Sequence, residues 1–152
     1  MKYLKVKMVM QPVHIDQDIS SAKKYLKGRE NLLYRFNSLI KNNLYPAFST
    51  DYPVAPLNPF LGIYSAVTHS GFNLSKNDIL NKNESISLFD AIKAYTNYSH
   101  SYSLFNNCGF LSEGFYSDFI VIDRDIFNIN SIDEILKTKV LKTFFKGEEV
   151  LI

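Results

Sequence analysis

Residues 44–51 read LYPAFSTD, a short apolar run that ends on a carboxylate. This run predicts a strand that ends at the Asp51 carboxylate, and Asp51, Tyr52 and Pro53 close it. Upstream, residues 3–13 read YLKVKMVMQPV, in which apolar residues alternate with lysine before the run becomes apolar throughout. That pattern predicts a strand entering a covered sheet, and Pro12, which lacks an amide hydrogen, ends its pairing.

A helix is predicted between these two strands. Residues 28–43 place apolar side chains three and four positions apart, as on one face of a helix, and these are Leu32, Leu33, Phe36, Leu39 and Ile40. Residues 15–27 read as a polar stretch that carries Asp16 and Asp18. The order strand, helix, strand predicts a βαβ unit with a parallel sheet.

The rest of the chain predicts more helix and then a small β unit. An extended loop over 53–59 precedes a short helix over 60–67, a polar and exposed stretch over 68–87, and a helix from the Ser87 cap to about residue 105. Residues 119–123 read as a buried strand, 131–136 as a short helical turn, and 140–152 as a terminal hairpin. We therefore divide the chain into residues 1–105 and a β unit over 106–152.

Composition sets limits on the class of protein. The 152 residues suit one domain or a piece of a larger one, and 46% hydrophobic against 21% charged residues favours a folded core. The net charge of +2 gives no field that would recruit nucleic acid or anionic lipid. With one cysteine and no apolar run of the roughly 20 residues that span a bilayer, we expect a cytoplasmic protein with neither nucleic acid nor membrane as partner.

Few residues could carry chemistry. Asp51 at a strand end could ligate a metal or accept a proton from water, or it could equally cap the turn that follows. His14 also follows a predicted strand, so it could lie at the same end of the sheet as Asp51, although a single histidine is more often a packed residue. His69 and His100 have no partner at the spacing of helical zinc sites, and Cys108 has no histidine near it in sequence.

Two glycines and an aspartate mark the turns before the β unit. Gly109 and Gly114 are not followed by the lysine and hydroxyl residue of a phosphate loop, so they read as turn glycines. Asp118 precedes an apolar strand and is expected to hold its turn by accepting hydrogen bonds from backbone amides.

Three stretches, in this order, resemble the C-terminal part of the amidohydrolase superfamily, specifically the family 3 group of YtcJ-like metal-dependent hydrolases. MQPVH at residues 10–14, with GRE at 28–30, is similar to that group's QP-x-H segment and its later G-x-R element. STDYPV at 49–54 resembles the S-D-x-P-V motif. Residues 88–147, with FDAI, YT, GFL, SDFIVID and TFFKG in order, resemble the family's ending. The resemblance covers most of the chain.

The resemblance implies an α/β fold, as a C-terminal fragment of a TIM barrel (its last two βα units) followed by the C-terminal half of a small β-sandwich. It implies Asp51 as a metal ligand or catalytic base, and His14 as a substrate contact. The complete enzyme would hold a divalent metal, zinc by expectation, and hydrolyse C–N bonds of small amides or cyclic amides.

The family's earlier ligands, a His-x-His pair, a lysine or acid and two further histidines, have no counterpart in this sequence. A catalytic metal needs about three protein ligands, so we expect none to bind this chain alone. The expected partner is an upstream half of the enzyme or a second copy of the chain. The alternative is a non-catalytic interaction or regulatory module derived from such an enzyme.

Overall fold

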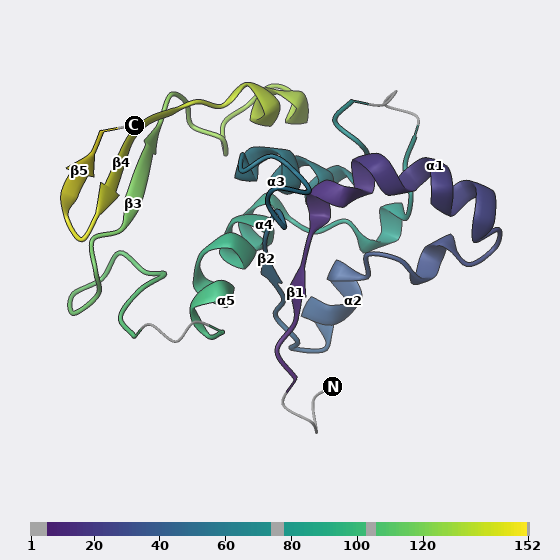
Figure 1. Cartoon of the computed structure of the whole chain (residues 1–152), viewed down its shortest axis with the longest axis horizontal. Coiled ribbons are helices and arrows are strands. Elements are labelled where there is room, and N and C mark those ends of the chain that lie inside the picture. The colour runs from purple at the N-terminus through teal and green to yellow at the C-terminus, as the bar shows by residue number, and fades with distance from the viewer. Residues whose placement is uncertain (1–5, 74–77, 103–105, 152) are drawn as a thin grey trace.

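The structure is a computed structural model that describes residues 6–73, 78–102 and 106–151. It is a mixed α/β fold in which two strands, β1 (Val9–Met10) and β2 (Ala47–Phe48), pair in parallel. Val9 lies opposite Ala47 and Met10 opposite Phe48, and helices surround the pair (Figure 1). The predicted parallel βαβ unit is confirmed.

The helices between β1 and β2 differ from the prediction. Residues 15–27, read as a polar stretch, contain α1 (Ile15–Tyr25), whose buried side chains are Ile15, Ile19 and Ala22. Their spacing makes a narrow apolar stripe that the surrounding lysines and aspartates conceal in the sequence. The helix predicted over 28–43 shrinks to a 3₁₀ turn, η3 (Glu30–Leu32), and α2 (Phe36–Lys41), because the chain turns at Tyr34 with φ 49°.

In the described part of the chain, α3, α4 and α5 follow β2. The short helix predicted over 60–67 is α3 (Pro59–Thr68), and the Asn58 side chain caps it by accepting a hydrogen bond from the Phe60 amide. The predicted Ser87 cap begins α4 (Leu88–Tyr95), but the helix breaks at Thr96 before the short α5 (Asn97–His100). The end predicted near residue 105 lies outside the described residues.

The stretch over 68–87 was predicted to be exposed. For its described part, this prediction is wrong. His69, Ser70, Leu80, Glu84 and Ile86 are all buried. The segment folds back on the body, since the Leu80 amide donates to the His69 carbonyl at 2.9 Å, and it forms a 3₁₀ turn, η4 (Lys82–Glu84), on the way to α4.

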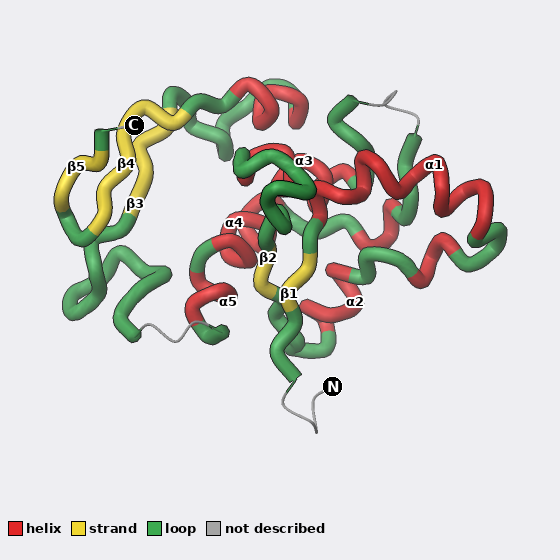
Figure 2. Tube along the Cα trace, viewed as in Figure 1, coloured by secondary structure: helices red, strands yellow, loops and turns green. Residues whose placement is uncertain are grey.

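The C-terminal part is a three-stranded antiparallel sheet in the order β3 (Phe119–Ile122), β4 (Val140–Phe145) and β5 (Glu148–Val150). Figure 2 shows these strands gathered to one side of the helical body, apart from β1 and β2. The predicted terminal hairpin is confirmed. The predicted turn before it is η5 (Ile132–Lys137), where Ser131 and Glu134 form a capping box.

Strand β3 was predicted to be buried, and this is wrong. Ile120 is 46% exposed and Val121 is 38% exposed, because the sheet packs against little else in the described chain. The main core lies instead in the helical body, around Phe36, Phe48 and Phe60, with Ile135 of η5 joining it. The β unit is thus attached to the body mainly through η5, which packs on α3.

Candidate functional site

The carboxyl ends of β1 and β2 lie side by side because the two strands run in parallel. The Ala47 amide donates to Met8 at 2.9 Å, and the Ser49 amide donates to Met10 at 3.0 Å. Beyond the last paired residues, the Gln11 side-chain amide donates to the Ser49 hydroxyl at 3.1 Å. This hydrogen bond joins the segment that leads to His14 with the segment that leads to Asp51. We call these two segments, residues 11–14 and 49–51, the strand-end rim.

Asp51 leaves the end of β2 with an exposed side chain and a left-handed backbone, φ 57°. Its carbonyl oxygen accepts a hydrogen bond from the Val54 amide at 2.8 Å, so the main chain closes the turn. Within the described part of the chain, no hydrogen bond or ion pair engages the Asp51 carboxylate. The carboxylate is therefore free of the capping role that the sequence left open.

His14 follows β1 in a 3₁₀ turn, η2 (Pro12–His14), directly before α1. Its side chain is half-buried, and Nε2 is covered without a hydrogen-bond partner among the described residues. Pro12 and Val13, which precede it, are buried. The two residues singled out from the sequence thus follow neighbouring strands, one open to solvent and the other partly covered.

The donors present do not form a metal site by themselves. The described residues contain no group of three or more His, Cys, Asp or Glu side chains that could hold an ion. A catalytic zinc requires about three protein ligands. Asp51 can therefore be at most one member of a ligand set.

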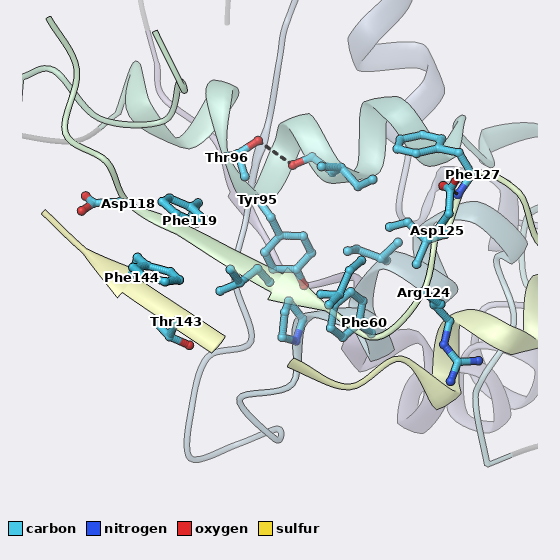
Figure 3. Close-up of a pocket in the computed structure, with 16 residues that line it drawn as sticks. Phe60, Tyr95, Thr96, Asp118, Phe119, Arg124, Asp125, Phe127, Thr143 and Phe144 are labelled. Carbon is cyan, nitrogen blue, oxygen red and sulfur yellow. Dashed lines mark hydrogen bonds between the residues drawn. The ribbon is translucent and has the colours of Figure 1, made fainter. Parts of the chain in front are cut away.

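A cavity of about 640 Å³ lies between the helical body and the three-stranded sheet, away from the rim. Figure 3 shows Phe60 and Tyr95 facing Phe119 and Phe144 across it. The charged groups at its edge are already paired. Asp118 accepts a hydrogen bond from the Lys146 amide at 2.7 Å, in the turn between β4 and β5 instead of its own turn as the sequence predicted, and Arg124 forms an ion pair with Asp123. Neither Asp51 nor His14 lines this cavity.

Two histidines have surroundings that the sequence did not reveal. His69, at the end of α3, has no solvent exposure, and its ring packs edge-on against Phe36 at 5.3 Å between centroids. His100 lies with Nδ1 3.3 Å from the Cys108 sulfur, although the sequence offered no histidine close to this cysteine. No local sequence pattern predicts that contact, because it depends on how the two residues pack in the folded chain.

Comparison with known proteins supports one family. The family model described as "Amidohydrolase family" matches residues 1–151. The chain is 29% identical over 125 residues to a putative amidohydrolase, YtcJ, of Bacillus subtilis, covering 82% of this chain and 23% of that protein. It is 32% identical over 148 residues to Protein LONG AFTER FAR-RED 3 of Arabidopsis thaliana, covering 93% and 24%.

A solved structure has the same fold. The crystal structure of an uncharacterized metal-dependent hydrolase from Pyrococcus horikoshii matches with a TM-score of 0.72 and 32% identity, over 84% of this chain and 26% of that one. The chain therefore spans about a quarter of the length of the relatives that it matches. No helix among the described residues is long and apolar enough to cross a membrane.

Proposed function

Since this chain belongs to the amidohydrolase family, we propose that it forms the last two βα units of a (β/α)₈ barrel and half of a β-sandwich in a metal-dependent hydrolase. The parallel pairing of β1 with β2 supports the barrel part, because every strand of such a barrel is parallel to its neighbours. The substrate class that we propose is a small amide or cyclic amide, cleaved at its C–N bond.

The observation that carries this proposal is the unengaged carboxylate of Asp51 at the carboxyl end of a parallel strand. Active sites of (β/α)₈ enzymes lie at that end. We assign Asp51 as the base that takes a proton from the attacking water and returns it to the leaving nitrogen. His14, on the neighbouring strand end, would contact the substrate.

The complete enzyme is proposed to hold a divalent metal, with zinc as the expected ion. Asp51 would contribute one ligand, and the other ligands would come from residues that this chain does not supply. The proposed partner is the upstream half of the enzyme. The alternative, an interaction or regulatory module without chemistry, is favoured by the exposed apolar residues of the three-stranded sheet.

The test combines this chain with the upstream half, expressed together, and follows hydrolysis of a panel of amides and cyclic amides. Asp51→Asn keeps the left-handed backbone favourable but removes the base, so we expect turnover to fall at least about 100-fold. Thr50→Ser, beside it, is the control and should keep full turnover. A wild-type pair that binds no metal and hydrolyses nothing would contradict the enzymatic proposal.

The stability of the same variant separates catalysis from structure. Because the Asp51 side chain is exposed and its carboxylate makes no hydrogen bond or ion pair among the described residues, its replacement should change the free energy of unfolding by less than about 0.5 kcal/mol. Thermal melts of this chain measure the change directly. A lower melting temperature together with unchanged turnover would show that Asp51 is a structural residue.

A further inference from the structure

His100 and Cys108 are held together by the packing of residues 108–110 against α5. The Asn97 side-chain amide donates to the Gly109 carbonyl at 2.6 Å, which fixes the returning segment beside Cys108. Gly109 has φ 82°, and a Cβ added there would lie 2.8 Å from the His100 Cβ. A larger residue at 109 would therefore force the returning segment or His100 to shift.

Two aromatic rings fix the imidazole in its place. Phe110 and Phe115 both pack edge-on against His100, at 5.9 Å and 6.1 Å between ring centroids. The two phenylalanines also contact each other at 5.2 Å. The imidazole is thus oriented from two sides, and its Nδ1 lies 3.3 Å from the sulfur, within hydrogen-bond distance for a thiol.

We propose that Cys108 is a nucleophilic thiol with His100 as its base, and that it forms mixed disulfides with low-molecular-weight disulfides. A nucleophile and a base within hydrogen-bond reach, with the base oriented by further groups, is the arrangement that activates a cysteine. Neither residue belongs to the strand-end rim, so this site is separate from the proposed hydrolysis.

The reaction balances without any further reagent. His100 Nδ1 takes the proton of the Cys108 thiol while the sulfur attacks one sulfur of the small disulfide. A new S–S bond forms, the old one breaks, and the leaving thiolate takes the proton from His100. Cys108 is the single cysteine of the chain, so the mixed disulfide persists instead of closing an internal bridge. A small thiol reverses the reaction.

The experiment uses this chain and 2-hydroxyethyl disulfide, a neutral probe, and follows the one possible adduct by intact mass. The reference is a synthetic peptide of residues 106–113, which carries the same cysteine without His100. We expect the folded chain to react about ten-fold faster than the peptide at pH 7, because only the folded chain places a base on the thiol. A rate at or below that of the peptide would overturn the proposal.

A matched pair of variants assigns the effect to His100. His100→Gln should lower the rate to that of the peptide, whereas Ser101→Ala, one residue away and exposed, should leave it unchanged. Far-UV circular dichroism checks that both variants fold, and the comparison with the peptide still decides if His100→Gln does not. Equal rates for the folded wild type and a folded His100→Gln would show that the histidine has no part in the reaction.

Discussion

His69 is a buried histidine whose ionisation opposes folding. Burial lowers the pKa of His69 to about 4, and the carboxylate of Glu84 only partly offsets this effect. In the unfolded chain the pKa is about 6.5. The neutral ring therefore adds stability that is fully present above pH 6.5 and is lost as the pH falls toward 4. The loss in the free energy of unfolding over this range is on the order of 3 kcal/mol.

Urea unfolding at pH 7 and pH 4.5 measures this loss. We expect the midpoint of the wild-type chain to fall with pH, and that of His69→Asn to be lower at pH 7 but nearly constant. Asparagine suits the left-handed backbone of this position, φ 54°, and does not titrate. His14→Gln is the control and should keep the wild-type slope. An equal slope in His69→Asn would assign the acid sensitivity to other groups.

Single residues also show what the sequence could and could not predict about the site. The position of Asp51 after a strand was predictable, because the apolar run and the turn residues after it are adjacent in sequence. The contact of His100 with Cys108 was not, since it depends on how residues 108–110 pack against α5 in the folded chain. The burial of His69 was hidden for a similar reason, as its covering residues come from α2 and from the segment around Glu84.

At the scale of elements, α3 and α4 pack closely at one glycine. A Cβ added to Gly62 of α3 would lie 2.0 Å from the hydroxyl of Tyr95 on α4. In an open helix, glycine to alanine would add about 1 kcal/mol of stability. Here we expect Gly62→Ala to cost about 1–3 kcal/mol instead, because the tyrosine must move. Chemical denaturation of the variant shows whether its free energy of unfolding rises or falls.

The tyrosine hydroxyl is the colliding atom, so its removal should relieve the clash. It is buried without a hydrogen-bond partner among the described residues. Tyr95→Phe alone should therefore be neutral or slightly stabilising. In the double variant, Gly62→Ala should cost less than it does alone, and a double-mutant cycle gives the coupling. Strict additivity of the two changes would mean that the cost of Gly62→Ala does not come from the Tyr95 hydroxyl.

The start of α4 is an element that the sequence predicted from its cap. The Ser87 hydroxyl accepts from the Asp90 amide at 3.0 Å and donates to the Asp90 carboxylate at 2.7 Å. Ser87→Ala should cost about 1 kcal/mol, while Ser87→Asn, which can still cap, should cost less. Thermal melts of both variants test this order. An equal loss in the two variants would remove the cap as its cause.

Elements that carry a local signal were predicted, and those that depend on distant packing were not. Caps and turn glycines can be predicted because neighbouring residues determine them, as at Ser87 and Gly109. The helix α1 was missed because only three of its side chains are buried, and they are separated by charged residues. Its partners come from other segments of the core, which periodicity within residues 15–25 does not display.

At the scale of the molecule, the helical body is well covered and the three-stranded sheet is not. Apolar side chains on this sheet are open to solvent, with Leu141 at 61% and Phe145 at 57% exposure. A sheet with exposed apolar residues and free edges normally pairs or is covered. The division of the chain at residue 105, predicted from the change of helical to strand spacing in the sequence, places the boundary before this uncovered part and stays a prediction.

We expect this chain alone to self-associate through the three-stranded sheet. Light scattering over a range of concentrations should show a weight-average mass that rises above that of one 17.5 kDa chain. Leu141→Ser on β4 should shift this rise to higher concentration, since it removes an exposed apolar side chain from the contact. Leu32→Ser, with a similar 58% exposure on the helical body, is the matched control and should leave it unchanged. A monodisperse monomer at every concentration would contradict self-association, and an equal shift in both variants would mean that the contact is not specific to the sheet.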